Sequence, residues 1–97
     1  MAKGYWVGAY RSVSDPEKLA AYGALARAAV EAAGGRFLAR GGAVTAFESG
    51  FAERTVLVEF PGYAEALAAY RGDDYQRALQ VLDGAAERDV RIVEGLD

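Results

Sequence analysis

The sequence predicts an α+β fold with the element order βαββαβ, the ferredoxin-like arrangement, in which an antiparallel four-stranded sheet carries its helices on one face. Three observations support this expectation. Strand-like and helix-like segments follow one another in this order along the 97 residues. Glycine pairs, prolines and polar clusters separate them, and no internal repeat, linker or low-complexity stretch interrupts them. A chain of this length is expected to form one domain, residues 1–97.

The first strand and the first helix have clear sequence boundaries. Tyr5 to Val13 is rich in aromatic and β-branched residues, which predicts a strand. The helix that follows has two alternative starts, either a capping box from Ser14 to Glu17 or an Asp15 cap with Pro16 at the first helical position. Apolar residues then recur at helical spacing as far as the Gly34-Gly35 pair, which predicts a left-handed stop.

A hairpin is predicted next. Arg36–Arg40 begins the second strand, Gly41-Gly42 predicts a bulge or kink, and the strand resumes from Ala43 to Glu48. The chain turns near Phe51 and returns as a strand from Arg54 to Phe60. Glu48 and Arg54 then fall opposite each other, and we expect them to form a structural ion pair across the ladder.

The last part of the chain reads as a broken helix and a strand. Tyr63 to Asp83 is predicted to be helical with a break at Gly72, after which Asp73 begins a capping box. A connection is expected over Ala85–Arg88 and a final strand over Val90–Glu94.

Some strand segments are apolar on both faces, which a sheet with one wet face should not be. They are Tyr5-Trp6-Val7, Val56-Leu57-Val58 and Ile92-Val93. Because no further element is left to cover the second face, we expect a homodimer joined through the sheet faces. Whether Val56 or Val58 points across that interface depends on the strand register.

Composition and charge exclude several classes of partner. With 11 basic and 14 acidic residues the net charge is -3, so the chain lacks the positive field that nucleic acid requires. The strand Thr55–Phe60 is aliphatic and acidic, without the stacking aromatics of RNA-binding relatives of this topology. No apolar run approaches the length of a membrane span and no apolar signal segment precedes the first strand, so we expect no membrane partner and a cytoplasmic location.

Cysteine and histidine are both missing from the sequence. Disulfides, thiolate nucleophiles, imidazole metal ligands and Ser-His-Asp triads are therefore excluded. Any catalysis is expected to proceed without metal, haem or another resident cofactor, although carboxylates alone could hold Mg²⁺ or Ca²⁺.

Short motifs along nearly the whole chain resemble one known family. They are Lys3-Gly4-Tyr5-Trp6, Gly35-Arg36-Phe37-Leu38-Ala39-Arg40-Gly41-Gly42, Val58-Glu59-Phe60-Pro61, Tyr70 with Tyr75-Gln76, Ala86-Glu87 and Ile92-Val93-Glu94-Gly95. In this order and at this spacing they resemble the domain of unknown function 1330 family, within the dimeric α/β-barrel superfamily. The resemblance implies a ferredoxin-like protomer and a homodimer, and it implies no known activity. The chain departs from the family pattern at Arg71-Gly72-Asp73-Asp74 and at Leu82.

Arg40 and Glu59 are the sharpest candidates for chemistry. A guanidinium beside small residues, as at Arg40 before Gly41-Gly42, can hold a carboxylate or enolate bidentately, or it can form a structural ion pair with Glu59. Glu59 lies between Val58 and Phe60, where burial would suit it to act as a catalytic acid or base, or as the partner of an arginine. Strand parity brings the two together only if Gly41-Gly42 bulges.

Aromatic residues are the second group of candidates. Tyr22, Tyr70 and Tyr75 lie on predicted helices, and with Trp6 they could line a pocket between helices and sheet, or simply form the core. We expect Arg40, Glu59 and one or both of Tyr70 and Tyr75 to converge on a cavity.

Two classes of function therefore remain open. The first is a protein that binds or acts on a small, planar, anionic organic molecule without metal or haem. The second is a non-catalytic dimeric module in which the charged residues serve only structure. A cavity lined by Arg40, Glu59 and a tyrosine favours the first class, and a packed interior with every charge paired favours the second.

Overall fold

The computed structural model describes residues 1–97 and contains four strands and three helices. Their bounds, in chain order, are β1 Gly4–Val13, α1 Pro16–Ala32, β2 Arg36–Arg40, β3 Thr55–Phe60, α2 Tyr63–Arg71, α3 Asp73–Leu82 and β4 Ala86–Glu94. The predicted α+β order is confirmed, with the second helical region divided in two at Gly72.

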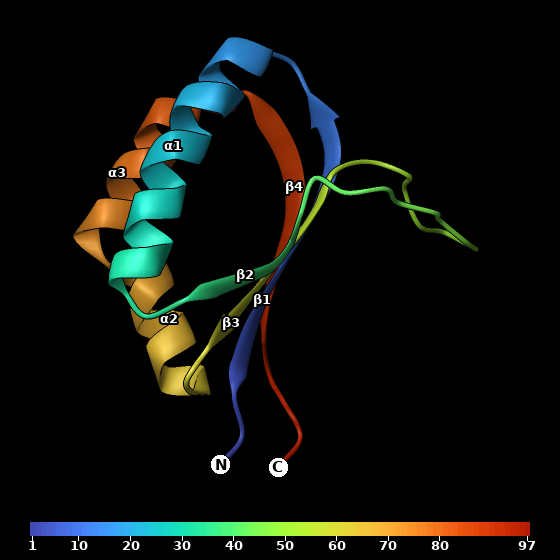
Figure 1. Ribbon diagram of the computed structural model, residues 1–97. Coiled ribbons are helices and arrows are strands. Elements are labelled where there is room, and N and C mark those ends of the chain that lie inside the picture. Colours follow the sequence, from blue (N-terminus) through green and yellow to red (C-terminus); the bar gives the residue numbers. More distant parts are fainter.

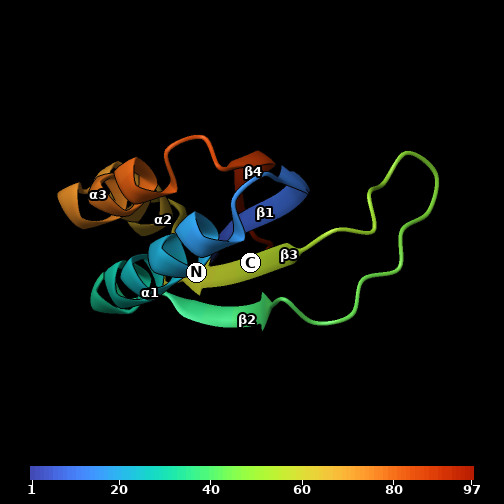
Figure 2. The ribbon, with the colours of Figure 1, turned by 90° about the horizontal axis from the view of Figure 1, so that it is seen from above.

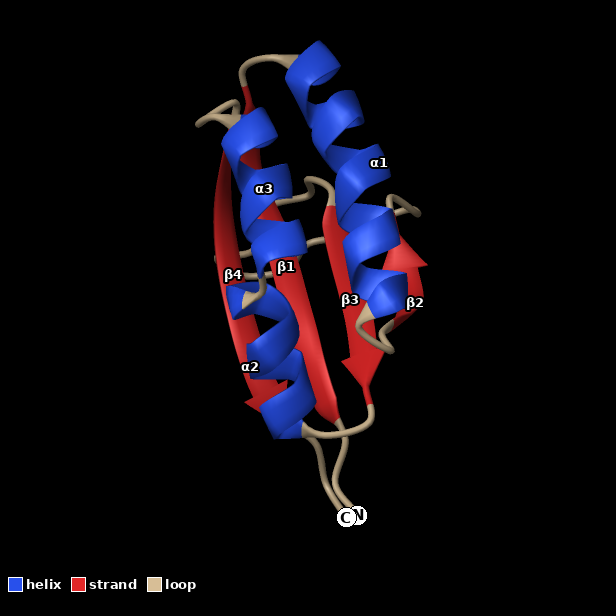
Figure 3. Cartoon of the chain, turned by 90° about the vertical axis from the view of Figure 1, so that its left-hand side faces the viewer, coloured by secondary structure: helices blue, strands red, loops and turns tan.

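The strands form one antiparallel sheet in the order β2-β3-β1-β4. All three helices cover the same face of this sheet, and the other face is left open (Figures 1 and 3). Residues 41–54 leave the sheet between β2 and β3 and project away from the helices (Figure 2). None of the helices combines the length and the apolar character that crossing a membrane requires.

Local signals set the ends of α1. The Asp15 carboxylate accepts hydrogen bonds from the backbone N–H groups of Glu17 and Lys18, at 3.1 and 3.2 Å, so the Asp15 cap is the start that the chain uses. The Ser14 hydroxyl instead donates to the Ala85 carbonyl at 3.1 Å. At the other end Gly34 adopts a φ of +87°, the left-handed stop that the glycine pair predicted.

The predicted course of the hairpin is wrong after Arg40. No strand forms over Ala43–Glu48, and β2 ends where Gly41 takes a φ of +75°. The register shift lies earlier than expected, between Phe37 and Ala39 rather than at Gly41-Gly42. Glu48, itself at a φ of 55°, forms no ion pair with Arg54, because the two residues belong to a loop instead of a ladder.

Two further boundaries differ from the prediction. The N-cap of α3 is Gly72, which has no side chain to donate or accept a capping hydrogen bond. Asp73 is therefore the first helical residue rather than the cap. β4 begins at Ala86, inside the segment expected to be a connection, because this stretch pairs with the end of β1. Arg88 consequently lies on a strand, opposite Tyr10.

The core lies between the sheet and the helices, and strand alternation decides which residues enter it. Trp6, Gly8 and Tyr10 of β1 face the helices, whereas Tyr5, Val7 and Ala9 face the open side. On β3, Val58 and Phe60 are each 1% exposed and form the centre of the core. Val56 points the same way as Val58, so neither valine faces the open side, and Leu57 does.

Candidate functional site

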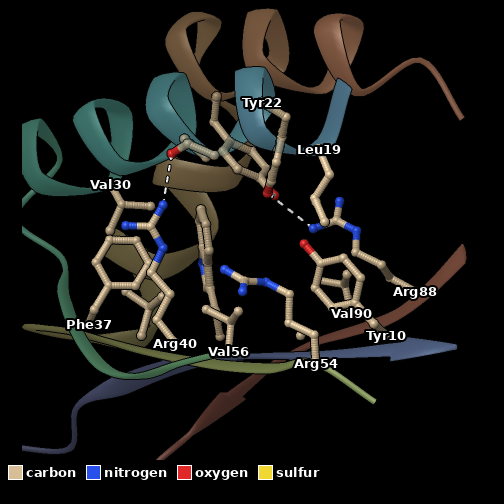
Figure 4. A pocket seen from close by; sticks show the side chains of 16 residues that line it. Tyr10, Leu19, Tyr22, Val30, Phe37, Arg40, Arg54, Val56, Arg88 and Val90 are labelled. Carbon is tan, nitrogen blue, oxygen red and sulfur yellow. Dashed lines mark hydrogen bonds between the residues drawn. The ribbon is translucent and has the colours of Figure 1, made fainter. Parts of the chain in front are cut away.

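A cavity of about 60 Å³ lies between α1 and the sheet. Eleven of its 16 lining residues are hydrophobic. Figure 4 shows their side chains converging from the helix above and the strands below. The lining consists of Trp6, Gly8, Tyr10, Leu19, Tyr22, Gly23, Ala26, Val30, Phe37, Arg40, Arg54, Val56, Val58, Tyr75, Arg88 and Val90.

A missing side chain helps to create this space. Gly8 faces the cavity from the middle of β1, in a row across the sheet with Val56 on one side and Val90 on the other. A Cβ atom at Gly8 would meet nothing nearer than the Val56 carbonyl oxygen at 3.8 Å. Close backbone packing therefore does not require glycine at this position, and its effect is to leave the sheet hollow beneath Tyr22.

Arg40 reaches the cavity from the end of β2. The bulge between Phe37 and Ala39 places Arg40 on the helix side of the sheet, where its guanidinium lies 5.0 Å from the centre of the Phe37 ring. Its Nη2 donates to the Gly23 carbonyl oxygen of α1 at 3.1 Å. A Cβ atom at Gly23 would lie 3.3 Å from this nitrogen, so the glycine leaves room for the arginine.

Arg54 and Arg88 approach from either side of Tyr10. The guanidinium carbon of Arg54 lies 5.9 Å from the centre of the Tyr10 ring, and that of Arg88 lies 5.5 Å from it. The Nε atom of Arg54 is buried and has no hydrogen-bond partner. A buried N–H without an acceptor is unfavourable, and such groups are rare in native proteins.

Two buried phenols lie opposite these cations. The hydroxyls of Tyr22 and Tyr75 share a hydrogen bond of 2.7 Å, and Arg88 donates to the Tyr22 oxygen at 3.1 Å. The two phenols carry two hydrogens, and only one of these is used between them. One O–H donor of the pair therefore has no protein acceptor.

Burial and the neighbouring groups fix the protonation of this cluster. Burial, followed by the neighbouring Tyr75, raises the pKa of Tyr22 above its ordinary value of 10.0, so its phenol stays protonated. Burial opposes the charge of Arg88, but the Tyr22 and Tyr75 oxygens more than offset this effect and raise the pKa of Arg88 above its ordinary value. The cluster thus holds a cation and neutral hydrogen-bond donors.

The charge of the cavity is unbalanced. Three arginines line it, and no aspartate or glutamate does. None of the three takes part in any of the ion pairs of the protein, which join other residues. Arg40 is exposed and the other two are half-buried, so the arginine-lined side of the cavity borders solvent.

Glu59 does not belong to this site, and the expectation that it meets Arg40 is wrong. Glu59 faces the open side of the sheet, where its carboxylate accepts a hydrogen bond from Arg36 at 3.0 Å and one from the Tyr5 hydroxyl at 3.3 Å. Lys3 lies 4.0 Å away. The bulge in β2 turns Arg40 to the other face, so Arg36 takes the place that the sequence assigned to Arg40.

Three of the four predicted aromatic residues line the cavity, and the fourth packs behind them. Trp6, Tyr22 and Tyr75 line the cavity together with Arg40. The Trp6 indole N–H donates to the Ala66 carbonyl at 2.8 Å, which fixes its ring. Tyr70 is not part of the lining; its ring packs against Tyr75 at 5.1 Å and against Trp6 at 5.8 Å, behind the wall.

Gly8, Tyr10, Arg54 and Arg88 are among the lining residues that the sequence analysis did not assign to a cavity. Arg54 was assigned to a hairpin ion pair, and Arg88 to a connection. Side chains alternate between the two faces of a strand, so Gly8 and Tyr10 face the same side as Trp6. This alternation could have assigned both residues to the cavity from the sequence. Nothing local marks Arg54 and Arg88, since the contacts that bring them together are long-range.

No metal site is evident, because no group of three or more acidic side chains is gathered closely enough to hold an ion. The absence of a metal from any reaction of this protein remains a prediction. Arg71, Gly72, Asp73, Asp74 and Leu82, where the sequence departs from the family pattern, all lie outside the cavity lining.

The fold and the antiparallel sheet order define the ferredoxin-like class of α+β proteins. Residues 3–96 match the model of the family described as domain of unknown function DUF1330. The chain belongs to this family, as its motifs indicated. No curated protein sequence matches it.

Solved structures support the same fold at low sequence identity. A protein of unknown function from Rhodopseudomonas palustris is 17% identical, with a TM-score of 0.75 over 99% of this chain and 84% of that one. A protein from Thermobifida fusca, described as dimeric, ferredoxin-like and of unknown function, is 14% identical, with a TM-score of 0.58 over 98% and 92%. A Nitrosomonas europaea protein that is provisionally described as an antibiotic biosynthesis monooxygenase is 15% identical, with a TM-score of 0.57 over 98% and 90%. At such identities these likenesses show the fold alone.

Proposed function

We propose that this protein binds a small organic anion in the cavity between α1 and the sheet. The observation that carries the proposal is the charge of the lining, which has three arginines, no carboxylate and a buried Arg54 Nε–H without an acceptor. A charge that is partly withdrawn from water needs a counter-charge, and the protein supplies no carboxylate to Arg54 or Arg88, which are half-buried, or to Arg40. The apolar majority of the lining suits the carbon body of an organic molecule better than a bare inorganic ion.

The chemistry of the lining favours binding over acid–base catalysis. Arginine stays charged at any ordinary pH and has no acceptor to offer. The raised pKa of Tyr22 keeps its phenol protonated, and Glu59 lies on the opposite face of the sheet. The cavity therefore offers donors that stabilise negative charge, and no group poised to take a proton from the ligand.

Arg54→Leu tests this proposal. The guanidinium carbons of Arg54 and Arg88 are both within 6 Å of the Tyr10 ring centre, so their repulsion is on the order of 1 kcal/mol at an effective dielectric constant near 20. Because the arginine has no carboxylate partner, we expect the variant to be at least as stable as the parent, by up to about 1 kcal/mol in urea titrations. A ligand anchor should also lose affinity for small carboxylates in isothermal titration calorimetry.

Arg36→Leu is the matched control. Arg36 is an arginine of the neighbouring strand whose partner, Glu59, is on the open face, so its loss should leave carboxylate binding unchanged. If Arg54→Leu is destabilised and binds carboxylates as the parent does, Arg54 is structural and the proposed function fails.

We also propose that the protein forms a homodimer through the open face of its sheet. Val7, Leu57 and Val93 lie on this face, and Val93 is 49% exposed although it belongs to a strand. The loop on the same side of the sheet carries Phe47 and Phe51, which are 78% and 56% exposed. Apolar surface of this kind commonly marks an interface, and the Thermobifida fusca neighbour is described as dimeric.

Leu57→Asp tests the dimer. Multi-angle light scattering of the parent should give about twice the mass of 10.3 kDa, and the variant, with a carboxylate in the centre of the face, should give the single-chain mass. Leu25→Asp is the control, since Leu25 is 44% exposed on α1, on the helix layer, and should leave the mass unchanged. A parent protein that is monomeric at micromolar concentration refutes the dimer.

A further inference from the structure

We infer that the ligand of the cavity is a short dicarboxylate, a linear dianion of about two to four carbon atoms. This inference rests on the proposed function and narrows it to a ligand class. The argument uses three features of the cavity, namely its volume, the separation of its cations along the sheet and the apolar surface between them.

The enclosed part of the cavity is too small for an aromatic ring. An aromatic ring of six carbons has been accommodated in an engineered cavity of about 150 Å³, and the share of one water in the liquid is about 30 Å³. The cavity here measures about 60 Å³, less than half the volume of that engineered cavity. One carboxylate and a short carbon chain fit inside, and any further group must lie at the side that borders solvent.

The register of the sheet arranges the cations in two rows. Arg54, Tyr10 and Arg88 form one row, because Tyr10 pairs with Arg88 and its N–H donates to the Arg54 carbonyl at 2.9 Å. Arg40 begins the next row, opposite Val56, which in turn pairs with Gly8. Arg40 and Arg88 are therefore on the two edge strands, β2 and β4, with the Gly8 hollow between them.

Both edge arginines reach toward the same turn of α1. Arg40 donates to the carbonyl of Gly23, and Arg88 donates to the hydroxyl of Tyr22, the preceding residue. Figure 4 shows Arg54 between them, pointing into the same space. Positive charge thus borders the cavity at two ends, and a ligand with a single carboxylate leaves one end without a counter-charge.

The two ends offer different surroundings. At the inner end, a carboxylate would lie near Arg54 and Arg88, which flank the Tyr10 ring, and would accept from the spare phenol hydrogen of the Tyr22 and Tyr75 pair. At the outer end, a second carboxylate would meet Arg40, whose side chain is exposed. A planar guanidinium can hold a carboxylate with two parallel hydrogen bonds.

The surface between the two ends favours carbon over oxygen. Val56 and Val90 flank Gly8 there, and the Phe37 ring lies beside Arg40. A tetrahedral dianion such as sulfate or hydrogen phosphate would turn oxygens toward these side chains and leave them without donors. The methylene groups of a dicarboxylate would instead be buried against them.

A ligand series tests the inference. Binding of oxalate, malonate, succinate and glutarate is measured by isothermal titration calorimetry at constant ionic strength, beside acetate, propionate, butyrate, sulfate and phosphate. We expect the best dicarboxylate to bind about tenfold or more tightly than the monocarboxylate of equal length, as a second charge-assisted hydrogen bond provides. Arg40→Leu should reduce dicarboxylate affinity by about the same factor and change monocarboxylate affinity by less than about threefold.

Each other outcome refutes a stated part of the argument. If monocarboxylates bind as tightly as dicarboxylates, or if Arg40→Leu weakens both equally, the dicarboxylate class is wrong and the proposed anion site stands. If sulfate or phosphate binds as tightly as every dicarboxylate, the ligand is an oxyanion and the inference fails. If no anion binds, and Arg54→Leu changes nothing, both the inference and the proposed function fail.

Discussion

Gly8 provides a direct test of the cavity, because filling it should stabilise the fold while it removes the site. Gly8 is in the interior of β1, where glycine is less favourable than alanine by about 0.5–1 kcal/mol. A Cβ atom there would meet the Val56 carbonyl oxygen at 3.8 Å and the Val56 Cβ at 3.9 Å, both ordinary van der Waals contacts. The backbone of Gly8 is not among the glycines with positive φ, so alanine causes no strain.

Because these contacts are unstrained, the expected gain in stability follows from the added methyl group and the backbone term. Burial of one added methyl group contributes about 0.8 kcal/mol, and together with the backbone term the gain is about 1–2 kcal/mol for Gly8→Ala. For a domain of this size each kcal/mol raises the melting temperature by roughly 4–8 °C. Gly8→Val adds three carbons to a cavity of about 60 Å³, so it should abolish carboxylate binding more completely than alanine does.

Differential scanning calorimetry with and without ligand measures both effects. A ligand at 100 times its dissociation constant stabilises the parent by about 2.7 kcal/mol, and this increment should be lost in Gly8→Val. Ala9→Val is the matched control, because Ala9 is the next residue of β1 and faces the open side. The reasoning is refuted if Gly8→Ala lowers the melting temperature, or if Gly8→Val keeps the full ligand increment.

Three other perturbations test neighbouring parts of the structure. Gly4→Ala should destabilise the protein by about 1–3 kcal/mol in urea titrations, because its Cβ would lie 2.7 Å from the Tyr63 Cα and against the Gly62 carbonyl; a neutral result would contradict this packing. Since burial, and then Tyr75, raise the pKa of Tyr22 above 10.0, the folded state binds this proton more tightly than the unfolded chain, and the free energy of unfolding should fall as the pH rises above about 10. Tyr22→Phe should make that alkaline decline shallower, and an unchanged slope would exclude Tyr22 as its source. Deletion of Leu38, the extra residue of the β2 bulge, should preserve folding and carboxylate binding, because the shortened strand still turns Arg40 toward the helices; loss of binding would show that the bulge itself shapes the site.

The sequence was sufficient where signals are local. The Gly34 stop and the break at Gly72 each depend on residues within one turn, and the element order followed from such signals. The start of α1 was narrowed to two alternative caps, and the structure uses Asp15. The aromatic candidates Trp6, Tyr22 and Tyr75 were also recognised, since their periodicity marks a buried face.

The sequence was insufficient where distant segments decide the outcome. β4 starts at Ala86 because this stretch pairs with the end of β1, more than 70 residues away, and Arg88 becomes a strand residue only through that pairing. A loop over residues 41–54 stands where a strand was predicted. Gly41 and Glu48 adopt positive φ values there, which a β-strand does not accommodate. A polar or charged residue near the end of a strand cannot be assigned to one face of the sheet before the strand register is known.

One bulge determines the charge of the site. In a regular β2, Arg40 would share a face with Leu38 and lie opposite the side that Phe37 occupies, toward Glu59, as the sequence predicted. The extra residue lets Phe37 and Arg40 both face the helices, where Phe37 packs against the core. Glu59 is then left to Arg36, Lys3 and Tyr5 on the open face. Arg40 is thereby separated from the one carboxylate that the strand next to it could have supplied, and the cavity gains a cation whose counter-charge must come from a ligand.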